Sequence, residues 1–181
     1  MNGHTPPTQY GTALALGEDG LLIIGPSGSG KSSLALSLLE GRPDRALIAD
    51  DRVALELVGK TLLASPPPEI EGLIEIRGLG ILRFPWRRRV PLRLIVELAP
   101  EGSCARLPGA AEQSLRVFGQ ELPLLRLPIG FFGAGARIQA ALALLRPSGD
   151  ALLHSGVDWT KLSRREEPGE DVSSARQAEE G

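Results

Sequence analysis

The chain contains the stretch Leu21-Leu22-Ile23-Ile24-Gly25-Pro26-Ser27-Gly28-Ser29-Gly30-Lys31-Ser32-Ser33. Its apolar run is too short for a buried helix and predicts a strand, and the leucines that follow Ser33 have helical spacing. Between them, Gly25 to Ser32 matches the pattern G-x-x-x-x-G-K-[ST]. We therefore predict a strand, a glycine-rich phosphate-binding loop and a helix, in that order.

Each part of this pattern has a chemical purpose. Glycines allow successive backbone N–H groups to point at phosphate oxygens, and the helix N-terminus adds a partial positive charge. Lys31 would reach the β- and γ-phosphates, and the Ser32 hydroxyl would bind Mg²⁺. The alternative is a glycine-rich turn that ends in Lys-Ser by chance. We favour a nucleoside triphosphate site, whose predicted contacts are Gly25, Pro26, Ser27, Gly28, Ser29, Gly30, Lys31, Ser32 and Ser33.

Length and composition limit the class of protein. A chain of 181 residues with 42% hydrophobic residues fits one globular domain, and its net charge of −2 argues against a polyanion-binding role for the whole chain. The single cysteine, Cys104, excludes an internal disulfide framework. The N-terminus lacks the basic and apolar regions of a signal peptide, and no apolar run is long enough to cross a bilayer. We expect a soluble, cytoplasmic protein.

The pattern along the chain predicts a mixed α/β domain. Residues 1–9 read as an N-terminal arm, 10–162 as the phosphate-loop domain and 163–181 as a disordered polar tail. Strands are expected at 12–16, 46–49, 53–58, 61–64, 92–98 and 122–127, and helices at 31–40 and 134–145. Hairpins outnumber helices, which favours a mixed sheet over a regular doubly wound one.

Two acidic residues end a predicted strand shortly after the phosphate loop. Asp50 or Asp51 could hold Mg²⁺ through water or accept a proton from an acceptor hydroxyl. The alternative is a turn in which Asp50 caps backbone groups and Asp51 is solvated. Because adjacent residues of a strand point to opposite sides, we expect only one of the two to face the site.

Two further charged stretches have open interpretations. Glu75 and Arg77 lie on one side of a predicted strand. The carboxylate could bind a metal ion and the arginine could bind phosphate, or the two could form an ordinary surface pair. The run Arg87-Arg88-Arg89 beside Trp86 could bind nucleic acid or lipid headgroups. In a slightly acidic protein, such a run is more often a solvated loop or a partner contact, and we expect no nucleic acid and no membrane.

Four blocks together resemble the catalytic domain of HPr kinase/phosphorylase, which acts on a serine of the phosphocarrier HPr. They are Gly25 to Ser32, Leu47 to Val53, Ile74 to Ile81 and, more weakly, Ala105-Arg106-Leu107 with Phe118-Gly119 and Leu122-Pro123. The third block, Ile74-Glu75-Ile76-Arg77-Gly78-Leu79-Gly80-Ile81, is the family's signature and is more specific than a phosphate loop. The chain looks like the short proteobacterial form, without the N-terminal domain of longer members.

The resemblance implies roles at the matching positions. Asp50 would be the general base, Asp51 would support the site, and Arg106 would correspond to the family's active-site arginine. Lys31 would hold the phosphates of ATP, and Ser32 and Glu75 would bind Mg²⁺. The fold would be a mixed sheet similar to that of phosphoenolpyruvate carboxykinase around the nucleotide. HPr or an HPr-like carrier would be the partner, and family members assemble as hexamers.

Two positions depart from the family pattern. Tyr10-Gly11 stands where the family usually has His-Gly, a histidine expected near the phosphate and important for the phosphorylase reaction. The stretch 129–135 lacks the family's basic loop, a site of acceptor recognition or subunit contact. The leading hypothesis is an ATP-dependent serine kinase, with or without a phosphorylase activity. The alternatives are a kinase for another hydroxyl acceptor and a nucleotide-sensing regulatory module.

Overall fold

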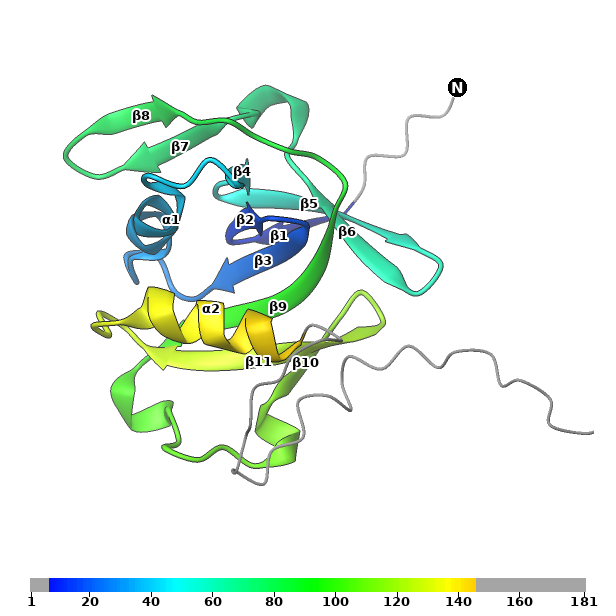
Figure 1. Ribbon diagram of the computed structural model, residues 1–181, viewed down its shortest axis with the longest axis vertical. Helices are drawn as coiled ribbons and strands as arrows, with labels where there is room; N and C mark the ends of the chain where they lie inside the picture. The colour runs from blue at the N-terminus through cyan, green and yellow to red at the C-terminus, as the bar shows by residue number, and fades with distance from the viewer. Residues whose placement is uncertain (1–6, 146–181) are drawn as a thin grey trace, which may run out of the picture.

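The computed structural model describes residues 7–145, in which a nine-stranded sheet and a separate two-stranded hairpin accompany two α-helices (Figure 1). The strands of the large sheet are β1 (Thr8–Tyr10), β2 (Thr12–Leu16), β3 (Asp19–Ile24), β4 (Arg45–Ala49), β5 (Arg52–Val58), β6 (Thr61–Ser65), β9 (Val90–Ala99), β10 (Ser114–Val117) and β11 (Gln120–Pro128). The hairpin consists of β7 (Leu73–Ile76) and β8 (Gly80–Arg83). The helices are α1 (Lys31–Leu39) and α2 (Ala134–Leu144), and short 3₁₀ helices lie at Pro68–Ile70, Glu101–Ser103 and Ala110–Glu112.

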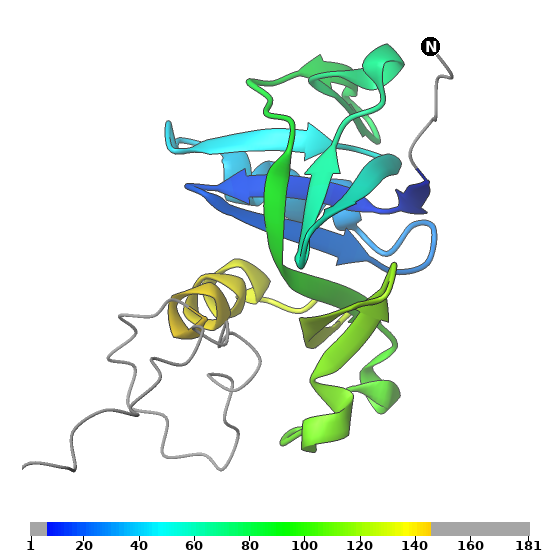
Figure 2. The ribbon, with the colours of Figure 1, turned by 90° about the vertical axis from the view of Figure 1, so that its right-hand side faces the viewer.

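Strand β9 organises the large sheet. It pairs in parallel with β3 on one edge, and on the other edge it pairs with β6 at its start and in parallel with β11 at its end. Figure 2 shows β9 (green) bending between the β5–β6 pair and the β10–β11 pair. Because β2 is antiparallel to both β3 and β4, strands β3, β4, β9 and β11 all run in the same direction. The sheet is therefore mixed, as the sequence predicts.

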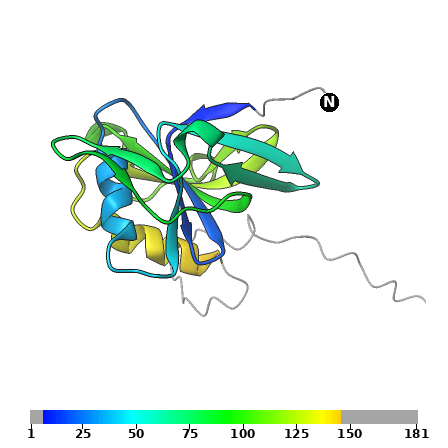
Figure 3. The ribbon, with the colours of Figure 1, turned by 90° about the horizontal axis from the view of Figure 1, so that it is seen from above.

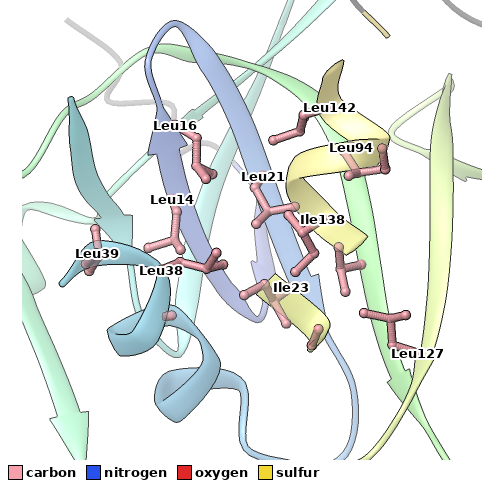
Figure 4. Close-up of a cluster of buried hydrophobic side chains, with 14 of the residues drawn as sticks. Leu14, Leu16, Leu21, Ile23, Leu38, Leu39, Leu94, Leu127, Ile138 and Leu142 are labelled. Atoms are coloured by element: carbon pink, nitrogen blue, oxygen red, sulfur yellow. The ribbon is translucent and has the colours of Figure 1, made fainter. Parts of the chain in front are cut away.

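The central strands bury both of their faces. Alternate side chains of β2 and β3, such as Leu14 and Leu21, pack with the two helices in one hydrophobic cluster (Figure 4). The residues between them, such as Ala13 and Leu22, pack on the other face against β5 and β6. Both helices lie on the same face of the sheet (Figures 1 and 3). Coverage of both faces explains why these strands read as apolar runs with little alternation.

Both helices begin in the same unusual way. The residues that precede them, Gly30 and Gly133, have left-handed backbone conformations (φ 89° and 86°) and no side-chain cap. The C-terminal end of α1 is held by Arg45, whose guanidinium donates hydrogen bonds to the Leu38 carbonyl (2.6 Å) and to Gln139 of α2 (3.1 Å). Burial lowers the pKa of Arg45. One side chain thus joins β4 to both helices.

The predicted strands and helices are confirmed, except that the strand with Glu75 ends at Ile76 and leaves Arg77 in the turn that follows. A turn at Gly59-Lys60 joins β5 to β6. The structure also contains two strands that the sequence did not predict, β10 and β1. Through β1, Thr8 and Gln9 of the expected N-terminal arm pair with β5. Both strands are too short to show a period in the sequence. The start of the arm, the domain boundary at residue 162, the tail at 163–181 and both histidines lie outside the described residues. Within residues 7–145, neither helix is long and apolar enough to cross a membrane.

Candidate active site

Four connections meet at one edge of the sheet, because β3, β4, β9 and β11 run in the same direction. They are the loop Gly25–Gly30 after β3, the Asp50-Asp51 pair after β4, the segment 100–107 after β9 and the segment 129–133 after β11. In open α/β sheets, ligands bind outside the carboxyl ends of the strands. We therefore expect a ligand-binding site at this edge.

The loop Gly25–Gly30, called the glycine loop below, approaches the backbone of β9 closely. A Cβ atom at Gly25 would lie 2.6 Å from the Leu98 carbonyl oxygen, so only glycine fits there. Lys31, at the start of α1, folds back over the loop, and its Nζ donates hydrogen bonds to the carbonyls of Gly25 (3.1 Å) and Pro26 (2.9 Å). The side chain of Ser29, within the loop, is buried, and its hydroxyl has no hydrogen-bond partner among residues 7–145.

Asp50 is the point at which three elements meet. Its side chain is only 9% exposed, and Oδ1 accepts a hydrogen bond from the hydroxyl of Thr12 (2.7 Å). The Ser32 hydroxyl donates to the same carboxylate, at 3.2 Å from Oδ1 and 3.4 Å from Oδ2. The backbone N–H of Glu75, in β7, donates to Oδ2 (3.2 Å). Three donors from β2, α1 and β7 therefore fix the direction of one carboxylate.

Asp51 lies in a different environment from Asp50. It is exposed and has a left-handed backbone conformation (φ 66°), which aspartate tolerates better than most residues. Its carbonyl oxygen accepts a hydrogen bond from the Gly11 N–H (3.1 Å). The pair thus divides into one buried carboxylate beside Ser32 and one exposed residue whose main chain contacts Gly11, between β1 and β2.

The β7–β8 hairpin brings the Glu75 and Arg77 region to the glycine loop. Ile74 and Ile76 are buried and anchor β7 against α1, which leaves the Glu75 side chain exposed on the opposite side. A Cβ atom at Gly28 would lie 3.6 Å from a guanidinium nitrogen of Arg77. The structure therefore brings a cation to the glycine loop and the backbone of Glu75 to Asp50, while the Glu75 carboxylate has no hydrogen bond or ion pair within residues 7–145.

Arg106 lies apart from these contacts. It is exposed in the segment after β9, and no hydrogen bond or ion pair joins it to any other residue between 7 and 145. It does follow one of the four strands that end at this edge. Thr12, by contrast, contacts Asp50 directly and was missed in the sequence. The sequence gives only a weak indication of this contact, because Thr12 is a single hydroxyl residue at the start of the otherwise apolar strand Thr12–Leu16.

The Arg87-Arg88-Arg89 run binds other parts of the chain. Arg87 contacts the Gly17 carbonyl (2.7 Å) and Glu18 (2.9 Å), and its hydrogen bond and charge lower the pKa of Glu18. Arg88 pairs with Glu71 and lies over the Trp86 ring (5.1 Å), and Arg89 pairs with Glu56. All three guanidinium groups thus have carboxylate partners. This arrangement favours the interpretation of the run as a solvated loop that holds its neighbours together.

The described residues contain no group of three or more histidine, cysteine, aspartate or glutamate side chains that could hold a metal ion. Such a group would be needed for a metal held by protein alone. The Ser32 hydroxyl and the exposed Glu75 carboxylate could instead serve as two oxygen ligands of a hard cation that shares its coordination with a bound phosphate.

Comparison with known proteins gives a consistent result. Residues 7–131 match the family model described as the HPr serine kinase C-terminal domain. The HPr kinase/phosphorylase of Caldicellulosiruptor bescii is 33% identical over 132 residues, which cover 67% of this chain and 42% of the relative. That of Burkholderia cenocepacia is 36% identical over 132 residues (67% and 39%). The chain thus spans about two fifths of the length of these relatives.

A solved structure supports the fold. The structure of the Hpr(Ser) kinase/phosphatase from Coxiella burnetii superimposes with a TM-score of 0.63 at 22% identity, over 74% of this chain and 92% of that one. The matched segment of the family model contains the glycine loop, Asp50, Glu75 and Arg106. The resemblance read from the four sequence blocks is confirmed: this chain belongs to the HPr serine kinase C-terminal domain family.

Proposed function

We propose that this chain is an ATP- and Mg²⁺-dependent protein serine kinase that phosphorylates HPr or an HPr-like carrier. One observation carries the proposal: the buried Asp50 carboxylate contacts the Ser32 hydroxyl beside the glycine loop. A carboxylate at this position can accept the proton of a serine hydroxyl that attacks a γ-phosphate. The choice of HPr as the acceptor follows from the relatives, which are named HPr kinase/phosphorylase.

The glycine loop and Lys31 would bind the phosphates of ATP. Lys31 Nζ now contacts two loop carbonyls, and these weak neutral partners can be exchanged for phosphate oxygens, which form stronger charge-assisted hydrogen bonds. The first N–H groups of α1 have no side-chain cap and no acidic neighbour in the first turn, so they can face an anion. Arg77 beside Gly28 would add a second positive charge at the phosphates.

Asp50 would act as the general base, and in the reverse direction as the acid. Thr12 and the Glu75 N–H would hold the carboxylate in one orientation, so that it faces the acceptor hydroxyl without reorganisation. Asp51 and Arg106 are exposed and would act on the acceptor side of the site, as support and as a positive charge for the transferred group.

The residues fit a magnesium ion bound together with nucleotide phosphates. Ser32 supplies a hydroxyl ligand, and the Glu75 carboxylate is free of partners within residues 7–145. Mg²⁺ usually takes only one or two protein oxygens and completes its shell with water and phosphates, which agrees with the small donor set. When bound, the ion would neutralise charge on the phosphates during transfer.

The direct test is incubation with γ-labelled ATP, Mg²⁺ and purified HPr, followed by intact-mass analysis. We expect one added phosphate on a serine. Asp50→Asn should lower the transfer rate by about 10²- to 10⁴-fold, the usual contribution of a general base, without loss of ATP binding. Asp44→Asn removes an exposed carboxylate remote from the glycine loop and is the control.

Two results would contradict the proposal. Transfer by Asp50→Asn at the wild-type rate would exclude the base assignment. Tight Mg-ATP binding without transfer to HPr would favour another hydroxyl acceptor or a nucleotide-sensing module, and an acceptor screen separates those two. A phosphorylase activity and a hexameric assembly, which the family resemblance implies, remain predictions, as does the cytoplasmic location expected from the sequence. Tyr10 in place of the family's histidine argues against the phosphorylase activity.

A further inference from the structure

The face of the sheet opposite the two helices contains a cavity of about 250 Å³, called the hairpin cavity below. It lies between strands β3 and β9 and the β10–β11 hairpin, which folds over them. Its apolar lining consists of Leu22, Ile24, Ile95, Leu115, Val117 and Phe118. The polar residues of the lining are Gln9 and Arg116. Figure 2 looks onto this face and shows the hairpin (yellow-green) turning toward β1 (dark blue).

The size and lining of the hairpin cavity suit a small ligand. A volume of about 250 Å³ lies just below the range of about 300–1,000 Å³ that is usual for pockets of drug-sized ligands. At about 30 Å³ for each water-sized group, the cavity holds about eight heavy atoms. The side chains of β3 and β9 that line it offer no polar group, so the part of a ligand that enters must be apolar.

Phe118 is held beside the cavity in a strained backbone conformation. Val117 pairs with Gln120, so Phe118 and Gly119 form a two-residue turn in which both residues have positive φ (46° and 81°). Such turns favour asparagine, aspartate or glycine, because other side chains crowd the backbone at positive φ. Phe118 is still 42% exposed, so full burial does not offset this strain. Strained residues of this kind are typical of sites where a side chain clamps a ligand.

Arg116 supplies the positive charge of the lining. Its guanidinium has no hydrogen bond or ion pair with any other residue between 7 and 145. Glu121, which is opposite Arg116 in the hairpin, accepts a hydrogen bond from the Ser114 hydroxyl (2.5 Å) instead. Since a guanidinium offers only donors, its best partner is an anionic oxygen group. One arginine among strands, without a helix N-terminus in the lining, suits the single charge of a carboxylate better than a phosphate.

We infer that the hairpin cavity binds a small monocarboxylate with an apolar body, about eight to ten heavy atoms in all. The apolar body would lie against β3, β9 and Phe118, and the carboxylate would pair with the exposed Arg116. This site is separate from the proposed nucleotide site, because α1, which carries Lys31 and Ser32, lies on the other face of the sheet. Carboxylate binding goes beyond the proposed kinase function and does not depend on it.

The position of the cavity connects it to the proposed active site. Ile24 lines the cavity and immediately precedes Gly25, whose backbone packs closely on β9. Gln9 lies two residues before Gly11, whose N–H donates to the Asp51 carbonyl (3.1 Å). A ligand in the cavity thus contacts both the strand that enters the glycine loop and the segment that contacts Asp51. We expect it to change the affinity for ATP, and ATP to change its affinity by the same factor.

The test is calorimetry with isocaproate and phenylacetate, each compared with its uncharged amide. We expect at least one carboxylate to bind with a Kd of about 1 mM or lower, which a ligand of this size can reach, and its amide to bind at least about fivefold more weakly. Arg116→Gln should weaken carboxylate binding at least about fivefold and leave amide binding unchanged. Arg42→Gln is the control, because Arg42 is also exposed but lies between α1 and β4.

Phe118→Asn distinguishes a ligand clamp from a structural residue. Asparagine suits the first position of this turn, so the variant should keep or raise the midpoint of thermal unfolding. The carboxylate Kd should nevertheless rise at least about fivefold, because one wall of the cavity is lost. A lower midpoint with an unchanged Kd would mean that Phe118 only stabilises the hairpin, and would overturn its role in binding.

The remaining outcomes also decide. No saturable binding of either carboxylate up to about 10 mM overturns the site, and equal affinity for acid and amide overturns the ligand class. Strict competition with a non-hydrolysable ATP analogue overturns a separate site, because the cavity would then hold part of the nucleotide. Carboxylate binding with an unchanged ATP affinity supports the site and overturns its coupling.

Sedimentation tests the other occupant. A dimer that Phe118→Asn dissociates, without carboxylate binding by the wild type, assigns the cavity to a second copy of the chain. Carboxylate binding by a protein that transfers no phosphate supports this site and overturns the kinase, so the two proposals fail separately.

Discussion

The two helices of this domain have nearly identical backbone conformations at their N-termini, but we expect only α1 to bind a nucleotide. Each follows a strand that is parallel to β9, and each begins after a glycine with a left-handed conformation and no side-chain cap. Around α1 the neighbours are Lys31, Ser32 and Asp50; around α2 they are Phe131, Phe132 and Arg137, whose guanidinium lies over the Phe131 ring (4.1 Å). We therefore expect phosphate binding at α1, where polar side chains accompany the uncapped helix N-terminus, and not at α2.

The largest contrast should come from the cations of the two helices. Lys31→Ala should weaken ATP binding about 10- to 100-fold, because charge-assisted hydrogen bonds to the phosphates are lost. Arg137→Ala should leave ATP affinity within about twofold. Titration with a fluorescent ATP analogue measures both. Equal losses would mean that both helix N-termini bind nucleotide and would remove the contrast.

The glycines should differ in their contribution to stability. Gly25→Ala forces a Cβ to 2.6 Å from the Leu98 carbonyl, whereas the Cβ of Gly133→Ala meets only the Phe131 ring at 4.0 Å. Gly133→Ala should therefore cost about 1–2 kcal/mol of unfolding free energy, from left-handed strain alone. Gly25→Ala should cost clearly more. Urea denaturation compares the two, and a larger loss in Gly133→Ala would contradict the close packing of the first loop on β9.

We expect the hydroxyl of Ser32 to contribute to phosphate transfer by binding Mg²⁺. Ser32→Ala removes the proposed ligand and should reduce Mg²⁺-dependent transfer about tenfold or more, while ATP binding measured in EDTA stays within about twofold of wild type. Ser37→Ala is the control, because its hydroxyl only contacts the Leu34 carbonyl within α1. A Ser32→Ala enzyme with an unchanged Mg²⁺ requirement would argue against the ligand.

The smallest effect concerns the loop before α2. Arg137→Gln removes the contact with Phe131 and should lower the unfolding free energy by only about 0.5–1 kcal/mol, the usual worth of an exposed cation–π pair. Thermal denaturation is the measurement. A much larger loss would show that this loop is held by its cation, as the first loop is by Lys31.

The sequence predicts the first of these regions well because its information is local. The strand, glycine loop and helix from Leu21 to Leu39 are contiguous, and each residue type has a conformational reason for its place. The pair Asp50-Asp51 is also readable as a strand end. The convergence of Thr12 and the Glu75 N–H on Asp50 is not readable, because it depends on pairing between segments distant in the chain.

The same reason explains the remaining differences. Strand β10 exists because it pairs with β11, and β1 because it pairs with β5, so neither needs a strong pattern of its own. The partners of Arg87, Arg88 and Arg89 come from three separate segments, and a run of like charges gives no hint of them.

The hydrogen bond from Glu75 to Asp50 is made by the main chain, and this has a consequence for variation at position 75. A side-chain contact disappears when its residue mutates, but a backbone N–H is present in every residue except proline. Position 75 can therefore change its carboxylate without releasing Asp50. A variant that lost the Glu75 carboxylate would therefore keep the hydrogen bond that orients the Asp50 carboxylate.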